Sequence, residues 1–543
     1  MKILGPALAP LLVIGVGVAS SPSCQPAFPT AVVPRALQVQ ITGGAQTATG
    51  PGALDTVLGM DSARIPITFE TPDVYTVSIQ ANDENGNVDT TFTGYVRLSI
   101  QPGNVLSVTG ENTNGRNVEL INGVLASDVQ VSILGAYGDS RIWAQDLGYQ
   151  PIDPDGVPLP DGGVRLPQCA NGIDDNHNGL VDYPIDPGCY APNDDSEDGG
   201  SYASASSQVI YFQYPRIADV EGVSNNGAGT PFPNEQVQIN TEWNGLTTNT
   251  PKGVVVTGVA STGFFVTDIG ETRGYASVYG YTYTAPTLMN VCDRFIAFGG
   301  TAAEFYGFLE INYPTWTLEQ WDPVERPCLV PEPTPITIAQ LQTTSSETLV
   351  LTPLEAGLVR VPAPDGSTIH IASMLGPGLI PYTTAANGTV SIAANAITPD
   401  VTSCDYEGTG KIDFENAAEA ACEAACTNNV ECSEYTQYAS NSQFQLVVVN
   451  EAGTASVSIT GDGASSAGFN PVQLRGQQLV AFTGNLTYFS GGSQFTIQAR
   501  CADDIVMPGN PILPSSPSWP TPPGKQQERA ACVVNLADQA TTN

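Results

Sequence analysis

The stretch Tyr75-Thr-Val-Ser-Ile-Gln-Ala81 alternates apolar and polar residues, and Gly94-Tyr-Val-Arg-Leu-Ser-Ile100 does the same. A period of two places every second side chain on one face of an extended chain, so both stretches predict half-buried β-strands. The dipeptides Asn85-Gly86 and Asn122-Gly123 separate such runs, and Asn-Gly is a strong signal for a hairpin turn. This pattern extends over residues 36–150 and predicts a β-domain there.

Strand patterns return further along the chain. Residues 206–332 contain Gly253-Val-Val-Val-Thr-Gly-Val-Ala260, followed at once by Gly263-Phe-Phe-Val-Thr-Asp268. Residues 333–506 contain a similar first strand, Glu355-Ala-Gly-Leu-Val-Arg-Val361. Between the first two regions, residues 151–205 are rich in Pro, Asp and Gly and predict a linker. The chain is therefore expected to be an all-β, multi-domain protein.

Length and charge restrict the classes of function. The chain has 543 residues, which corresponds to about three or four domains. Its 54 Asp and Glu against 18 Lys and Arg give a net charge of -36, which argues against nucleic acid as a partner. The two histidines, His177 and His370, lie in no recognisable catalytic motif. We therefore expect no catalytic residues and no enzymatic activity.

The N-terminus has the features of an export signal. Met1-Lys2 precedes an apolar run and a stretch of small residues, which predicts a signal peptide over residues 1–23. Cys24 resembles the acylated first residue of bacterial lipoproteins, although Ser21 stands where that family usually has Leu. The resemblance implies lipidation at Cys24, a lipidated linker over residues 24–35, and membrane contact through the lipid anchor only. Ordinary cleavage nearby, leaving Cys24 as one more oxidised thiol, is the alternative.

The other cysteines form an even set, which in an exported protein predicts five disulfides. They are Cys169, Cys189, Cys292, Cys328, Cys404, Cys422, Cys426, Cys432, Cys501 and Cys532. The Ala- and Glu-rich composition of an insertion over 403–440 predicts a short helix held by two disulfides. We expect Cys532, in the Pro-rich C-terminal tail 507–543, to pair with Cys501.

The most specific local motif lies between Cys169 and Cys189. Oxygen-bearing side chains stand at alternate positions on a turning loop, as calcium requires: Asp174, Asn176 and Asn178, followed by the backbone carbonyl of Leu180 and by Asp182. Ile185 stands where an EF-hand has its bidentate Glu. The motif is similar to the Cys-flanked, Asp-rich loops of Gram-negative surface lipoproteins. That resemblance implies a structural Ca²⁺ with Asp186, and with Asp194, Asp195 or Glu197, completing the ligands. A metal-free linker, closed by a Cys169–Cys189 disulfide, is the alternative.

Two further resemblances concern the domains. The stretch from Ala81 to Gly103 resembles bacterial immunoglobulin-like surface domains, which implies an Ig-like β-sandwich over 36–150. Residues 206–332 and 333–506 resemble the OB-fold-like barrels that accompany bacterial extracellular nucleases, which implies two OB-like β-barrels. The second would carry the disulfide-rich insertion. Cys292 replaces the usual Gly of this family, and Cys328 is its expected partner.

Aromatic residues cluster in the first expected barrel. Tyr279, Tyr281 and Tyr306 are candidates for a ligand surface, because OB folds present such rings to bases or sugars. The same rings could serve only to pack the sheet, because Tyr279 and Tyr281 alternate along one strand. A glycan or protein ligand fits this acidic chain better than DNA. The pair Asp503-Asp504 is expected to be a solvated turn.

These observations predict a non-catalytic lipoprotein of the Gram-negative cell envelope, at the outer membrane or cell surface. Its expected role is binding or scaffolding, with stability from calcium and disulfides. The alternative is an accessory subunit that presents nucleic acid or polysaccharide to a separate extracellular hydrolase.

Overall fold

The structure is a computed structural model. It describes residues 35–44, 53–60, 64–243, 251–323, 325–343, 350–372, 382–384, 390–392, 443–450, 453–462, 477–489, 494–517 and 530–533. The expected signal peptide and Cys24 lie outside the described residues. So does the insertion over 403–440 with its four cysteines, Cys404, Cys422, Cys426 and Cys432.

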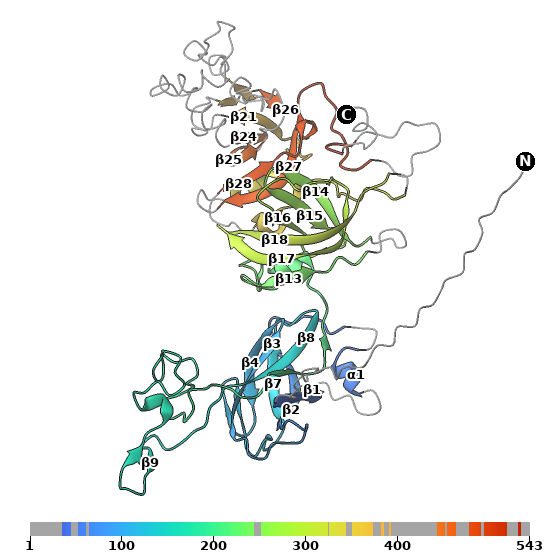
Figure 1. The fold of residues 1–543 in the computed structure, drawn as a ribbon. Coiled ribbons are helices and arrows are strands. Elements are labelled where there is room, and N and C mark those ends of the chain that lie inside the picture. Colours follow the sequence, from blue (N-terminus) through green and yellow to red (C-terminus); the bar gives the residue numbers. More distant parts are fainter. Residues whose placement is uncertain are drawn as a thin grey trace, which may run out of the picture.

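The first domain consists of two antiparallel sheets around one core (Figure 1). One sheet has the order β1 (Ala36–Gly44), β2 (Asp73–Asn82), β7 (Val129–Leu134) and β4 (Asn104–Thr109). The other has the order β8 (Asp139–Asp146), β3 (Gly94–Gln101), β6 (Asn117–Leu120) and β5 (Thr113–Asn114), and β11 (Ala205–Ser206) and β12 (Ile210–Tyr211) also pair with β8. The short helix α1 (Ala53–Val57) lies beside β1.

The sequence pattern explains these strands. In β2 every second residue from Tyr75 to Ala81 is buried, as the period of two predicts. The predicted turn at Asn122-Gly123 is confirmed, since Ile121 pairs with Val124 and both turn residues have a positive φ, 52° and 80°. A two-residue hairpin of this kind favours Asn-Gly, because these residues tolerate the left-handed conformation.

The second domain is a closed ring of five strands. They are β14 (Val254–Ala260), β15 (Gly263–Asp268), β16 (Ser277–Tyr281), β18 (Phe308–Glu319) and β17 (Arg294–Phe305), and β17 pairs back with β14. The β16–β18 pair is parallel and the others are antiparallel. β13 (Gln236–Ile239) adds to the open side of β17. Helix α2 (Ile217–Val220) precedes this ring.

The third domain has a related strand order. β20 (Leu358–Val361) pairs with β27 (Ala481–Phe489), followed by β28 (Gln494–Gln498), β25 (Gly453–Asp462), β24 (Gln443–Asn450) and β21 (Thr368–Ala372). Its β25–β28 pair is parallel. The remaining elements are β19 (Thr334–Pro335), α3 (Ile338–Thr343), β22 (Tyr382–Thr384), β23 (Val390–Ile392), β26 (Gln478–Leu479) and β29 (Ile505–Val506).

Aromatic packing joins the first domain to the second. The ring of Phe232, at the start of the second domain, packs edge-on against Phe69 at 5.4 Å and against Tyr137 at 5.2 Å between ring centroids. The hydroxyl of Tyr137 also donates a hydrogen bond to the backbone carbonyl of Gln236. These contacts fix the orientation of the two domains, because a buried, hydrogen-bonded aromatic ring cannot slide without losing its partners.

Arg500 joins the second domain to the third and corrects one expectation. Its Nη1 donates to the backbone carbonyl of Thr257 at 3.2 Å, while its guanidinium binds both carboxylate oxygens of Asp504 at 2.9 Å. Asp504 is buried, so the expectation of a solvated turn at Asp503-Asp504 was wrong at this residue. A carboxylate can be buried here because the bidentate ion pair compensates its charge.

The prediction of an all-β, multi-domain protein is confirmed, since the described residues form several sheets with few and short helices. The described residues contain three disulfides: Cys169–Cys189, Cys292–Cys328 and Cys501–Cys532. Within the described ranges, no helix combines the length and the apolar composition needed to span a bilayer.

Candidate functional site

The loop between Cys169 and Cys189 belongs to a module that projects from the first domain (Figure 1). This module begins with a small hairpin of β9 (Val157–Pro158) and β10 (Val164–Arg165). Tyr190, directly after the disulfide, anchors the module to the first domain. Its ring packs against Tyr149 at 5.0 Å between centroids, and its hydroxyl accepts a hydrogen bond from Asn117.

Three carboxylates meet inside this loop. Asp174, Asp186 and Glu197 each place one oxygen within 4.8 Å of the others. Asp186 and Glu197 are each 1% exposed, and Asp174 is partly buried. We call these three residues the acidic cluster. Two of its members come from the Cys-closed loop, and Glu197 reaches it from the segment that follows.

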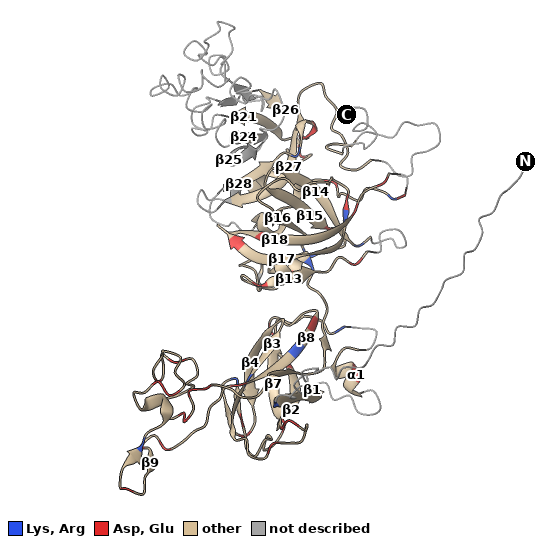
Figure 2. Ribbon diagram, viewed as in Figure 1, with Lys and Arg blue, Asp and Glu red and all other residues tan. Residues whose placement is uncertain are grey.

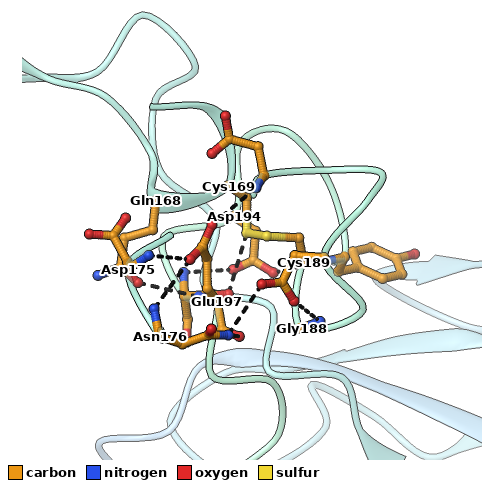
Figure 3. The surroundings of a disulfide bond; sticks show 12 residues. Gln168, Cys169, Asp175, Asn176, Gly188, Cys189, Asp194 and Glu197 are labelled. Atoms are coloured by element: carbon orange, nitrogen blue, oxygen red, sulfur yellow. Dashed lines mark hydrogen bonds between the residues drawn. A yellow bond between two sulfur atoms is a disulfide. The ribbon is translucent and has the colours of Figure 1, made fainter. Parts of the chain in front are cut away.

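Glu197 organises the loop from its centre (Figure 3). Its Oε2 accepts hydrogen bonds from the backbone N–H groups of Asp175 at 2.6 Å and Asn176 at 3.3 Å, and its Oε1 accepts one from Asp182 at 3.2 Å. Gly188 lies against the Glu197 backbone so closely that a Cβ at position 188 would overlap the carbonyl. The conformation of the loop therefore depends on the segment that carries Glu197.

Asp186 is held by two asparagines. The Nδ2 atoms of Asn176 and Asn178 donate to its Oδ2 at 3.3 Å and 3.0 Å, while its Oδ1 accepts the N–H of Gly188 at 2.7 Å. Asp174 accepts the N–H groups of Asn178 and Gly179. Every member of the acidic cluster is thus oriented by neutral donors.

Among the described residues, no Lys or Arg forms an ion pair with the acidic cluster. The nearby cation is Arg165, and it forms a bidentate pair with Asp195 at 2.6 Å and 2.8 Å. Figure 2 shows acidic residues along this module with little basic charge among them. Buried carboxylates without a compensating charge are costly, so Asp174, Asp186 and Glu197 are the described residues that could hold a cation.

The expected calcium ligands divide into two groups. Asp174, Asn176, Asn178 and Asp186 lie together at the acidic cluster. Asp182 instead binds the N–H groups of Asn171 and Gly172 at 3.2 Å and 2.7 Å, and the N–H of Leu180 donates to the Asn178 side chain. The Asp182 carboxylate therefore binds backbone N–H groups at the start of the loop, and it is not part of the acidic cluster.

Glu197 was one of three alternatives in the sequence, and tertiary contacts select it. Asp195 binds Arg165, and Asp194 accepts N–H groups from Gln150, Tyr190 and Ser196. Burial raises the pKa of the Asp194 carboxyl, and these backbone donors oppose the rise. Both aspartates thus hold the module together outside the acidic cluster.

The expected aromatic surface does not form as a unit. Tyr279 is buried, packs on Phe265 at 4.7 Å and hydrogen-bonds Thr262, and burial raises its pKa to about 12. Tyr306 is exposed, but it lies with Phe305 at the tip of the β17–β18 hairpin. Tyr279 is therefore a packing residue and does not belong to an exposed ligand surface.

Tyr281, one of the expected residues, belongs to a different aromatic group, whose member Tyr313 sequence reasoning missed. Tyr281 packs on Tyr283 at 4.5 Å, and the hydroxyl of Tyr283 donates to that of Tyr313 at 3.0 Å. Tyr283 and Tyr313 are 56% and 69% exposed, and both have a positive φ. Tyr283 follows the end of β16 and Tyr313 lies within β18, and the parallel pairing of these two strands brings the rings together.

Comparison with known proteins gives little further information. No family model matches the chain, and no curated protein matches it. Among solved structures, the dimeric latent PorU from Porphyromonas gingivalis aligns at 13% identity with a TM-score of 0.14, over 55% of this chain and 26% of that chain. A similarity this low supports no argument about fold or function.

Proposed function

We propose that this protein is a non-catalytic lipoprotein of the Gram-negative cell envelope, which binds or scaffolds at the outer membrane or cell surface. The observation that carries the scaffold role is the packing of β-domains against one another through buried contacts such as Tyr137–Phe232 and Arg500–Thr257. Domains fixed in series present the same surfaces at the same spacing, as a binding scaffold requires. The three disulfides support an oxidising compartment.

A structural calcium ion is part of this proposal. Asp174, Asp186 and Glu197 supply charged oxygens, which calcium prefers. Rotation of the Asn176 and Asn178 side-chain amides by 180° would turn their oxygens toward the position that Nδ2 now occupies beside Asp186. The ion would compensate the buried negative charge and hold Glu197 to the Cys-closed loop.

The finer fold assignment also belongs to the proposal. Two sheets around one core are consistent with an Ig-like β-sandwich in residues 36–150. The closed ring of five strands in the second domain, and the parallel strand pair found in both domains, support OB-like barrels in residues 206–332 and 333–506. The similar strand order is consistent with a duplication of one barrel within the chain.

Localisation and binding test this function together. Wild type should fractionate with membranes and be accessible to protease on intact cells, whereas Cys24→Ser should move to the soluble fraction. The full-length Cys24→Ser protein can then be tested on glycan arrays and with DNA, in the presence and absence of calcium. Soluble wild-type protein would contradict the lipoprotein assignment. Tight DNA binding in ~0.2 M salt would favour the accessory-subunit alternative instead.

A further inference from the structure

A cleft lies between the first two domains. It has a volume of about 870 Å³, which is within the usual range for a ligand site. β13, β17 and β18 supply one side, and the start of the β3–β4 connection and the turn before β8 supply the other. Because Tyr137 and Phe69 pack on Phe232, the two sides are held at a fixed distance.

The side formed by the second domain carries several polar residues. Gln238 pairs with Gly299, and Gly299 pairs with Thr315, so these residues form a row across three neighbouring strands. Gln238 and Thr315 are exposed. Gly299 has no space for a side chain, because a Cβ would come within 2.6 Å of the Val237 carbonyl. The row therefore places two exposed polar side chains, Gln238 and Thr315, on either side of a buried glycine.

The opposite side adds a fixed aromatic ring and an amide. Tyr214 lies between Gly138, whose hypothetical Cβ would be 2.7 Å from the ring, and the guanidinium of Arg64, 5.1 Å from the ring centroid. Gln101 also lines the cleft and is exposed. Among the described residues, the side chains of Gln101, Gln238 and Thr315 have no hydrogen-bond partner, so they are free to bind a ligand.

The charge of the cleft distinguishes it from the rest of the molecule. No Lys, Arg or His lines it, and its two acidic residues are Asp139, which is paired with Arg64 at 2.8 Å, and Glu235. Burial raises the pKa of the Glu235 carboxyl. A phosphorylated or sulfated ligand would find no cation among the lining residues, because Arg64, which contacts Asp139 and Tyr214, is already paired with Asp139, and it would meet the net charge of -36. Amides and hydroxyls both donate and accept hydrogen bonds, as sugar hydroxyls do.

We propose that this cleft binds a neutral oligosaccharide segment, with Gln101, Gln238 and Thr315 as the residues that hydrogen-bond its hydroxyl groups. This inference rests on the proposed role as a surface binding protein and names the class of ligand. Trp316 lines the same cleft, but its indole ring packs on the core residue Phe264 at 5.3 Å between ring centroids, so the hydrogen-bonding side chains carry the recognition.

Affinity electrophoresis of the full-length Cys24→Ser protein tests the proposal, with dextran, galactomannan, xylan and soluble starch as neutral probes and alginate as the anionic one. We expect retardation by at least one neutral polysaccharide and none by alginate. The double variant Gln238→Ala/Thr315→Ala should bind about tenfold more weakly, since two hydrogen bonds are lost. The matched control Gln40→Ala/Thr109→Ala changes exposed residues of the first domain outside the cleft, and should bind as wild type.

Three results would overturn the inference: no retardation by any neutral probe, retardation by alginate alone, or equal binding by the cleft variant and wild type. None of these three results contradicts the proposed function, provided that the wild-type protein is membrane-anchored and surface-exposed. Loss of surface localisation would instead contradict the proposed function, whatever the polysaccharide result. Circular dichroism and thermal unfolding of both double variants show whether a loss of binding reflects a loss of fold.

Discussion

Asn485 of the third domain donates a hydrogen bond from Nδ2 to the hydroxyl of Thr257 in the second domain, at 3.3 Å. The same nitrogen donates to the backbone carbonyl of Ala356 at 3.0 Å, and both Asn485 and Thr257 are fully buried. The link therefore joins two strands, β27 and β14, that are more than two hundred residues apart in sequence. It lies where no water can replace a lost partner.

Loss of this amide should weaken the junction between the second and third domains. We predict that Asn485→Ala lowers the free energy of unfolding by roughly 1–3 kcal/mol, because buried acceptors lose their donor. Urea denaturation followed by fluorescence measures the change. Asn114→Ala, at an exposed position of β5, is the matched control and should change stability little. Equal stability of the two variants would show that the link adds nothing to the junction.

Glu355 should make stability depend on pH. Burial raises the pKa of its carboxyl to about 8, and Glu304 adds to the rise, while the N–H of Leu309 donates to Oε1 at 3.1 Å. The pKa in the unfolded chain is near 4.5, so the folded state binds the proton more tightly. This stability is complete below about pH 4.5 and is lost as the pH rises through about 8.

The matching experiment compares Glu355→Gln with wild type between pH 5 and pH 9. Gln keeps an acceptor for the Leu309 N–H but cannot ionise. We predict that the free energy of unfolding of wild type falls relative to this variant by on the order of 3 kcal/mol over this range. Glu111→Gln, which changes an exposed carboxyl, should follow wild type. If the free energy of unfolding changes equally with pH in wild type and in Glu355→Gln, Glu355 is not the group whose protonation stabilises the fold.

Calcium should protect the acidic cluster and the loop around it. We predict that EDTA increases proteolysis within residues 170–200 while the flanking domains stay folded, and that Glu197→Gln does the same without EDTA. Calcium at 100 times its Kd should stabilise the folded module by about 2.7 kcal/mol. Mg²⁺ should not substitute, because its octahedral geometry fits an irregular oxygen site poorly.

Asp198→Asn provides the control for this experiment, because Asp198 is an exposed acid next to Glu197 and outside the acidic cluster. It should keep the calcium dependence of wild type. If cleavage is the same with calcium, with EDTA and in Glu197→Gln, the loop is closed by its disulfide and hydrogen bonds alone.

The disulfide between Cys292 and Cys328 should stabilise the second domain. It closes a segment with a sequence separation of 36 residues, for which chain entropy predicts about 3–4 kcal/mol. Cys292→Ala/Cys328→Ala should therefore unfold at lower temperature in calorimetry.

Alkylation of the unreduced protein should label none of the ten cysteines after Cys24. Two or more labelled thiols would contradict the prediction of five disulfides.

The strands, the hairpin turn and the Cys-closed loop could be predicted from local sequence patterns. The period of two in Tyr75–Ala81 and the turn at Asn122-Gly123 fix strand and hairpin, because both depend on the residues within a single element. Cys169 and Cys189 likewise mark the ends of a closed loop, and the oxygen-rich residues between them indicate its chemistry. A side-chain period or a turn dipeptide acts over a few residues, so it can be seen in the sequence itself.

Only the tertiary structure decided which neighbours these residues meet. Glu197 joins Asp174 and Asp186, while Asp182 turns to other backbone groups, because the module folds back after the disulfide. Tyr279 is covered by packing, and the cleft beside Gln238 exists because Phe232 fixes two domains against each other. Burial, charge compensation and cavities depend on contacts between distant segments, and a local pattern specifies the face of a strand without specifying what covers it.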